Sequence, residues 1–385
     1  MGHPGWGDMP KRAYASSGRT AAGSGDGPAP TGPVEERPVV GDAAPDDHPA
    51  VPLNAGVVPP GPEELPPPGP PGDPRAASAS ELTDYTIVRR RSDRPGYGWR
   101  RALYVVTGGT VNPGIGSAEL RRQDWARRIR RQLPGPRQIA VVSMKGGVGK
   151  TTVTAMLGLT LAEHRGDRVI ALDANPDAGT LAGRLTGKSD STVRDLLDNI
   201  GSLRSLSDVA RYTTLAGRLQ VLASEQDPAR GEAFNRAEYE QVCAVLARFY
   251  NIVVTDSGTG MVHSAMDGTL ALANSLVVVG SLTVDGASRA SKTLDWLVAH
   301  GFEEMVARSV VVLSSDRTSR EIDAGRLRAH FEGRVRAVVE VPHDPHLATG
   351  ARIELSSTSR ATADAFLELA ALVADEFGGL PLPRP

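Results

Sequence analysis

Residues 144–152 read MKGGVGKTT, and this stretch decides the fold class. An apolar run at 139–142 precedes it, and an apolar segment of helical length at 152–164 follows it. Glycines let backbone N–H groups turn toward one anion, and a helix N-terminus adds a favourable dipole. Lys150 is spaced to reach the β and γ phosphates of a nucleotide, and Thr151 offers a hydroxyl to Mg²⁺. The predicted phosphate-binding residues are Gly146, Gly147, Val148, Gly149, Lys150, Thr151 and Thr152.

Short apolar runs alternate with longer helical segments from Gln138 onward. The runs, predicted as strands, lie at 139–142, 169–172, 221–223, 252–254, 276–279, 310–313 and 335–341. The helical segments include 152–164, 237–249, 287–300, 319–331 and 360–377. Apolar strands that alternate with helices predict a parallel sheet covered on both faces. We therefore expect a doubly wound, mostly parallel α/β sheet of the P-loop NTPase type, with its site at the carboxyl ends of the strands.

The chain has 385 residues, but their composition is uneven. Residues 1–80 hold 18 of the 29 prolines and 10 acidic against 5 basic side chains. Such a segment buries too little apolar surface to offset its ordering entropy, so we expect a disordered, acidic, Pro/Gly-rich tail. Residues 89–131 instead carry 12 arginines against 3 acidic residues. The net charge of −2 therefore averages two opposite segments, and it excludes a globally basic nucleic-acid binder.

The arginine-rich part forms its own predicted segment, residues 81–136. A helix is expected from about Ala118 to Leu133, with Leu120, Trp125 and Ile129 on an approximate apolar stripe and the arginines opposite. We divide the chain into a tail at 1–80, an Arg-rich amphipathic extension at 81–136, a nucleotide-binding domain at 137–378 and a short C-terminal tail at 379–385. The arginines are either a solvated face or a surface for nonspecific DNA.

The single cysteine, Cys243, leaves no disulfide framework and no cysteine-based metal site. No stretch approaches about 18 consecutive apolar residues. We therefore expect a cytoplasmic protein that reaches the inner membrane only as a peripheral component, through partners.

The order K-G-G-V-G-K-T-T resembles the deviant Walker A motif of the MinD/ParA family of P-loop ATPases. In that family the first lysine, here Lys145, crosses a dimer interface and contacts the nucleotide of the other subunit. The resemblance covers about residues 138–378. It implies ATP and Mg²⁺ as ligands, ATP hydrolysis and an ATP-dependent homodimer.

A carboxylate segment, DANPDAG at 173–179, follows the second predicted strand. It resembles the family's switch I, usually Asp-x-Asp, in which Asp173 matches the first aspartate and binds the metal. Asn175 stands where relatives have the second aspartate, which helps to place the attacking water. An amide orients water but does not accept a proton, so slow hydrolysis is expected, with normal hydrolysis or none as alternatives. Asp177 is a candidate substitute for the missing carboxylate.

The stretch IVVTDSGTG at 252–260 resembles the Walker B and switch II region. By that resemblance Asp256 reaches Mg²⁺, directly or through water, and Gly260 approaches the γ-phosphate. The family's usual proline, two residues after the acid, is Gly258 here. Two later loops fit the adenine end of such a site, and Asp316 and Pro342 are their candidate residues.

The order of these segments along the chain favours one biological role over the others. An acidic Pro/Gly-rich tail, the sequence GWRRALY at 98–104, an Arg-rich helix and a MinD-like ATPase together resemble the EspI-like proteins associated with actinobacterial type VII secretion. That resemblance implies an ATPase that regulates or assists the secretion machinery, with its components as partners. A ParA-type partition ATPase that binds nonspecific DNA and a non-hydrolysing nucleotide-binding scaffold are the alternatives. A membrane cycler of the MinD type is less favoured, because the last five residues contain three prolines.

Overall fold

A computed structural model describes residues 98–112, 114–144, 146–175, 179–225, 234–258, 264–316 and 322–378. The predicted tail at 1–80 and the C-terminal tail at 379–385 lie outside these ranges, so both remain predictions. The described residues contain an eight-stranded sheet in the order β3-β4-β2-β5-β1-β6-β7-β8. Its strands are β1 Arg137–Val142, β2 Val169–Ala174, β3 Thr214–Ala216, β4 Leu219–Leu222, β5 Ile252–Ser257, β6 Ser275–Ser281, β7 Val310–Ser314 and β8 Ala337–Val341.

Neighbouring strands run parallel throughout, except for the pair β3 and β4. The predicted mostly parallel, doubly wound sheet is therefore confirmed. Strand β3 was not predicted, because it is only three residues long and its central Leu215 is 62% exposed. It turns back onto β4 through Gly217, whose φ of +59° lies in the left-handed region that glycine adopts readily.

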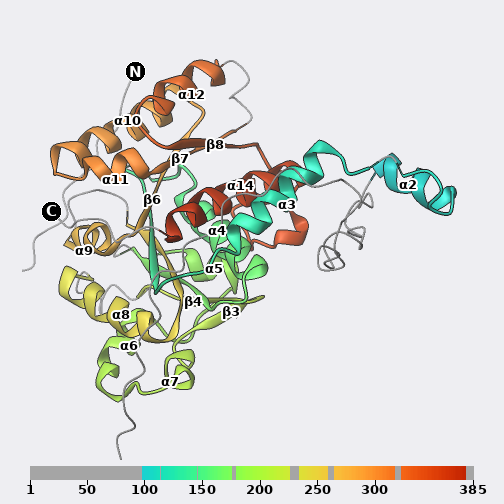
Figure 1. The fold of residues 1–385 in the computed structure, drawn as a ribbon. Helices are drawn as coiled ribbons and strands as arrows, with labels where there is room; N and C mark the ends of the chain where they lie inside the picture. Colours follow the sequence, from blue (N-terminus) through green and yellow to red (C-terminus); the bar gives the residue numbers. More distant parts are fainter. Residues whose placement is uncertain are drawn as a thin grey trace, which may run out of the picture. The chain divides into compact units, whose positions relative to one another are not determined.

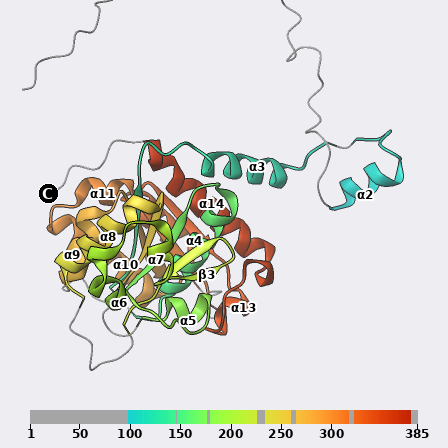
Figure 2. The same cartoon turned by 90° about the horizontal axis from the view of Figure 1, so that it is seen from below.

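Helices cover both faces of the sheet (Figures 1 and 2). On β1, Ile139 and Val141 join the apolar cluster of α4 and α14, whereas Ala140 and Val142 join the cluster of the opposite face. This alternation places a hydrophobic core on each side of the sheet, as buried parallel strands require. The longer helices are α4 Lys150–His164, α8 Arg236–Phe249, α9 Ser264–Leu272, α10 Val284–Ala299, α12 Ala324–Glu332 and α14 Arg360–Asp375.

The other described α-helices, apart from α3, have nine residues or fewer. They are α2 Gly98–Val106, α5 Leu181–Leu185, α6 Val193–Asp198, α7 Leu206–Ala210, α11 Glu303–Arg308 and α13 Pro345–Ala348. The helix predicted at 319–331 begins only at Ala324, after its N-cap Asp323. Among the described residues, no helix is both long enough and apolar enough to cross a membrane.

Helix α3, Ser117–Ile129, packs along α14 (Figure 1). Ile129 is fully buried in the core of that face and Trp125 packs against it, but Leu120 is 53% exposed. The predicted stripe was therefore wrong for Leu120, because residues five apart on an α-helix point about 140° apart. Its arginines also do not all face away from α14. The ion pairs Arg122–Asp364 and Arg128–Asp375 join the two helices, and Arg131, two residues after α3, also pairs with Asp375.

Candidate nucleotide-binding site

The loop between β1 and α4 has the backbone geometry of an anion cradle. Gly147 and Gly149 have φ values of +82° and +95°, which residues with a side chain rarely adopt. Gly149 is the N-cap of α4 and contributes no side chain, so the first-turn N–H groups of the helix are left for a ligand. The glycine pattern of the sequence thus builds a helix N-terminus suited to phosphate.

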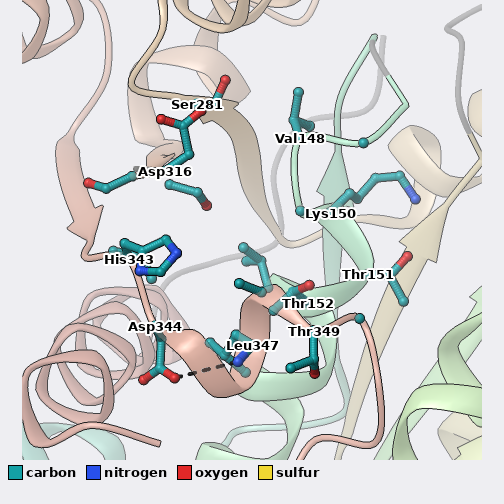
Figure 3. A pocket seen from close by; sticks show the side chains of 18 of the residues that line it. Val148, Lys150, Thr151, Thr152, Ser281, Asp316, His343, Asp344, Leu347 and Thr349 are labelled. Atoms are coloured by element: carbon teal, nitrogen blue, oxygen red, sulfur yellow. Dashed lines mark hydrogen bonds between the residues drawn. The ribbon is translucent and has the colours of Figure 1, made fainter. Parts of the chain in front are cut away.

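A cavity of about 1130 Å³ opens above this loop (Figure 3). It lies at the carboxyl ends of β1, β6, β7 and β8, the edge at which doubly wound sheets bind ligands. The predicted residues that line it are Gly146, Gly147, Val148, Gly149, Lys150, Thr151, Thr152, Asn175, Asp316 and Pro342. The structure therefore brings four separated segments of the chain to one cavity, although the role of each residue remains a prediction. Lys145, Asp177 and Gly260 lie outside the described residues.

Lys150 is buried at the base of the cavity and is held by β5. Its Nζ lies 2.7 Å from Asp256 Oδ1 and also donates to the carbonyl oxygen of Ser257. Thr154, one turn along α4, donates its hydroxyl to the same Asp256 oxygen at 3.3 Å. The lysine and the aspartate, 106 residues apart in sequence, therefore form one buried ion pair.

Asp173 stands beside Asp256, because these two residues are paired in register on β2 and β5. Both side chains are only 1% exposed. Burial, and then repulsion by the Asp256 carboxylate, raise the pKa of Asp173 to about 7. The backbone N–H groups of Leu181 and Asn175 donate to Asp173 at 3.0 and 3.2 Å and act in the opposite direction.

This pair of carboxylates fits a divalent cation. Mg²⁺ is commonly held by one or two carboxylates together with a hydroxyl and the phosphates of its nucleotide. Asp173 and Asp256 would supply the carboxylates, and Thr151 at the start of α4 would supply the hydroxyl, as the sequence predicts. Within the described ranges, no cluster of three or more His, Cys, Asp or Glu residues could hold a metal without such help. The donor set therefore suits a metal that arrives with a nucleotide.

The loop after β2 is fitted closely around Asp173. A Cβ atom on Gly179 would overlap the Asp173 carboxylate, and the Gly179 N–H donates to Ser224 Oγ at 2.8 Å. Gly179 was not singled out in the sequence, because its role depends on the loop folding back over the end of β2.

Two further residues of the cavity wall also escaped prediction. Arg184 on α5 reaches the first turn of α4, where its Nη1 donates to Thr152 Oγ1 at 2.6 Å. Asp344 caps α13 and accepts from the N–H groups of His346 at 2.9 Å and Ser359 at 2.8 Å. Burial alone would raise the pKa of Asp344, but these hydrogen bonds outweigh it and hold the pKa below its ordinary value. Neither residue belongs to a recognisable motif.

Comparison with known proteins agrees with this geometry. The family model of the CobQ/CobB/MinD/ParA nucleotide binding domain matches residues 139–349. The ESX-1 secretion-associated protein EspI of Mycobacterium tuberculosis (strain H37Rv) is 37% identical over 284 residues. The match covers 73% of this chain and 42% of EspI, so the chain spans less than half of that relative's length. The resemblance to EspI-like proteins is thereby confirmed.

Two solved structures share the fold. A ParA family ATPase from Chlorobium tepidum aligns with a TM-score of 0.53 at 19% identity, over 61% of this chain and 98% of that one. The septum site-determining protein MinD from Pyrococcus horikoshii, complexed with Mg-ADP, aligns with a TM-score of 0.50 at 22% identity, over 61% and 94%. With a phosphate-binding loop, a parallel sheet in this strand order and a matching family model, the chain belongs to the CobQ/CobB/MinD/ParA nucleotide-binding domain family.

Proposed function

We propose that the chain binds ATP with Mg²⁺, hydrolyses it slowly and serves as an ATP-gated dimeric switch in type VII secretion. One observation carries the proposal: a glycine loop and Lys150 line a cavity of about 1130 Å³, and Lys150 forms a buried ion pair with Asp256, the strand neighbour of Asp173. A cavity of this size accommodates a nucleotide. The Mg²⁺ would offset the charge of the phosphates, which is the chemistry that a metal supplies in phosphoryl transfer.

Each residue of the site has its own role in nucleotide binding and hydrolysis. The N–H groups of the loop hold the phosphates, and Lys150 exchanges its contact with Asp256 for one with the β and γ phosphates. That exchange frees the Asp256 carboxylate, which together with Asp173 and the Thr151 hydroxyl is suited to the metal. Asn175 lines the cavity next to Asp173 and orients a water molecule through its amide, but it does not accept the proton of that water. Turnover is therefore slow.

ATP-dependent dimerisation rests on Lys145, by resemblance to the deviant Walker A motif. We expect the full chain to double its mass in light scattering when Mg²⁺ and a non-hydrolysable ATP analogue are added. Lys145→Ala is expected to bind the analogue and stay monomeric, because the lysine acts on the partner's nucleotide. Lys188→Ala, at an exposed position after α5, is the matched control and should dimerise. A Lys145→Ala variant that dimerises normally would contradict the clamp.

The role in secretion rests on the likeness to EspI. The 284 aligned residues exceed the segment matched by the family model, so the likeness includes residues outside the nucleotide-binding family segment. We propose that the chain works in the cytoplasm, next to the membrane components of the machinery. Its host should release altered amounts of small type VII substrates when the gene is deleted. The intact gene should restore them and a Lys150→Ala copy should not; unchanged release after deletion would contradict the role.

A partition role would use the arginines at 89–131 to bind DNA. Three of them, Arg122, Arg128 and Arg131, form ion pairs with acidic residues of α14. These pairs reduce the charge that α3 offers to a phosphate backbone, and they favour the secretion role over partition.

A further inference from the structure

We infer that Arg184 is a phosphate-binding residue of the nucleotide site, and that its guanidinium contacts the phosphate joined to the ribose. The inference rests on the proposed nucleotide binding and adds a residue and a subsite to it. None of the motifs read from the sequence includes Arg184.

The guanidinium bridges two walls of the cavity. Its Nη1 donates to Thr152 Oγ1 in the first turn of α4 at 2.6 Å, and its Nη2 donates to the carbonyl oxygen of Leu347 in α13 at 3.2 Å. The backbone carbonyl of Arg184 accepts from the N–H of Ile353 at 2.7 Å, which fixes the end of α5. Figure 3 shows Thr152 and Leu347 side by side along the cavity wall. The side chain is therefore held in place before any ligand binds.

The charge of this guanidinium is not neutralised within the part of the chain that the structure describes. Both hydrogen-bond acceptors are neutral, no described carboxylate forms an ion pair with it, and its Nε is buried without a hydrogen-bond partner. Burial lowers the pKa of Arg184, and the Asp256 charge offsets this only in part. A partly buried cation without an anion costs folding free energy, and an anion in the cavity would recover that cost.

The position of Arg184 along the cavity indicates which phosphate of the nucleotide it contacts. Lys150 stands next to Asp256, at the end suited to the terminal phosphates and the metal. The guanidinium of Arg184 contacts Thr152 and α13, and α13 follows β8 and the Pro342 loop that is predicted to hold the base. The group between the base end and the terminal phosphates is the ribose-linked phosphate. A planar guanidinium binds such a group through two parallel N–H bonds.

The experiment compares Arg184→Met with Arg211→Met, whose arginine is exposed on the C-terminal side of α7. Affinities for ADP and ATP are measured by calorimetry on the full chain, and thermal midpoints are measured without ligand. We expect Arg184→Met to weaken both nucleotides about 10- to 100-fold, the scale of a lost charge-assisted contact. Its midpoint without ligand should be unchanged or raised, since an apolar side chain replaces a partly buried cation that has no anionic partner. Arg211→Met should leave affinity and midpoint unchanged.

The opposite pattern would overturn the inference. Unchanged affinity with a lowered midpoint would make Arg184 a structural bridge between α4 and α13. A loss confined to ATP would assign the contact to the γ-phosphate, because ADP and ATP share the ribose-linked phosphate. If the unmodified chain bound neither nucleotide, the proposed function itself would fail, and the inference with it.

Discussion

Lys150, Asp173 and Asp256 set the electrostatics of the site at the scale of single residues. One buried cation lies against two neighbouring carboxylates, and it contacts Asp256 through a hydrogen bond of 2.7 Å. Burial, and then the Asp256 repulsion that this single lysine leaves in place, raise the pKa of Asp173 to about 7. Phosphates that draw Lys150 away would increase this repulsion, unless a metal arrives with them. Nucleotide and metal should therefore bind together.

The switch residue Asn175 gives a direct test of the proposed slow turnover. Asn175→Asp restores a carboxylate that accepts a proton and orients water, so steady-state phosphate release at saturating ATP and Mg²⁺ should rise about tenfold or more. Asn199→Asp makes the same charge change at an exposed position outside the cavity, and should not alter the rate. A rate in Asn175→Asp equal to that of the parent would show that the amide does not limit hydrolysis.

Helix α3 belongs to the segment predicted as an extension, residues 81–136, but it packs on the nucleotide-binding domain. Its ion pairs with α14 and the burial of Ile129 tie it to the face of the sheet that α4 covers. Arg165, which follows α4, also donates to the carbonyl oxygen of Arg131 at 2.9 Å. We therefore expect α3 to unfold together with the sheet.

Truncation of the buried anchor tests this attachment. Ile129→Ala should lower the free energy of unfolding by about 2–5 kcal/mol, the usual cost of a large-to-small change in a core. Leu120→Ala, on the same helix but 53% exposed, should change it by less than about 0.5 kcal/mol. Urea denaturation of both variants measures the difference. Equal, small effects would mean that α3 lies loosely on α14.

Motifs and apolar runs predicted the elements that carry a strong local signal. All seven predicted strands are present, and Asp173 and Asp256, predicted as site residues by resemblance to switch I and Walker B, lie near the ends of two of them. Gly179 and Arg184 were missed, because their roles arise only when the segment after β2 folds back over β2 and α4. Leu120 was misplaced, because an approximate apolar stripe does not specify which side chain faces the neighbouring helix.

At the scale of the whole molecule, the strand order explains why distant residues meet. Strand β1 lies between β5 and β6. The connection after β1 runs to β2 on one side of the sheet, and the connection after β6 runs to β7 on the other, so a crevice opens between them at the carboxyl edge. The phosphate loop, switch I, and the loops after β7 and β8 all line that crevice (Figures 1 and 3). In the proposed function, this crevice binds ATP through Lys150.

Calorimetric titration of ATP with Mg²⁺ into the full chain tests this binding. The variants Lys150→Ala and Lys292→Ala are titrated in the same way. Lys292 is exposed on α10 and serves as the control, and each variant's thermal midpoint is checked first so that binding is measured on folded protein. We predict saturable binding to the parent and to Lys292→Ala, and an affinity at least about tenfold lower for Lys150→Ala, since a charge-assisted contact with phosphate is lost. Equal affinities in all three proteins, or no binding to the parent chain, would contradict the account.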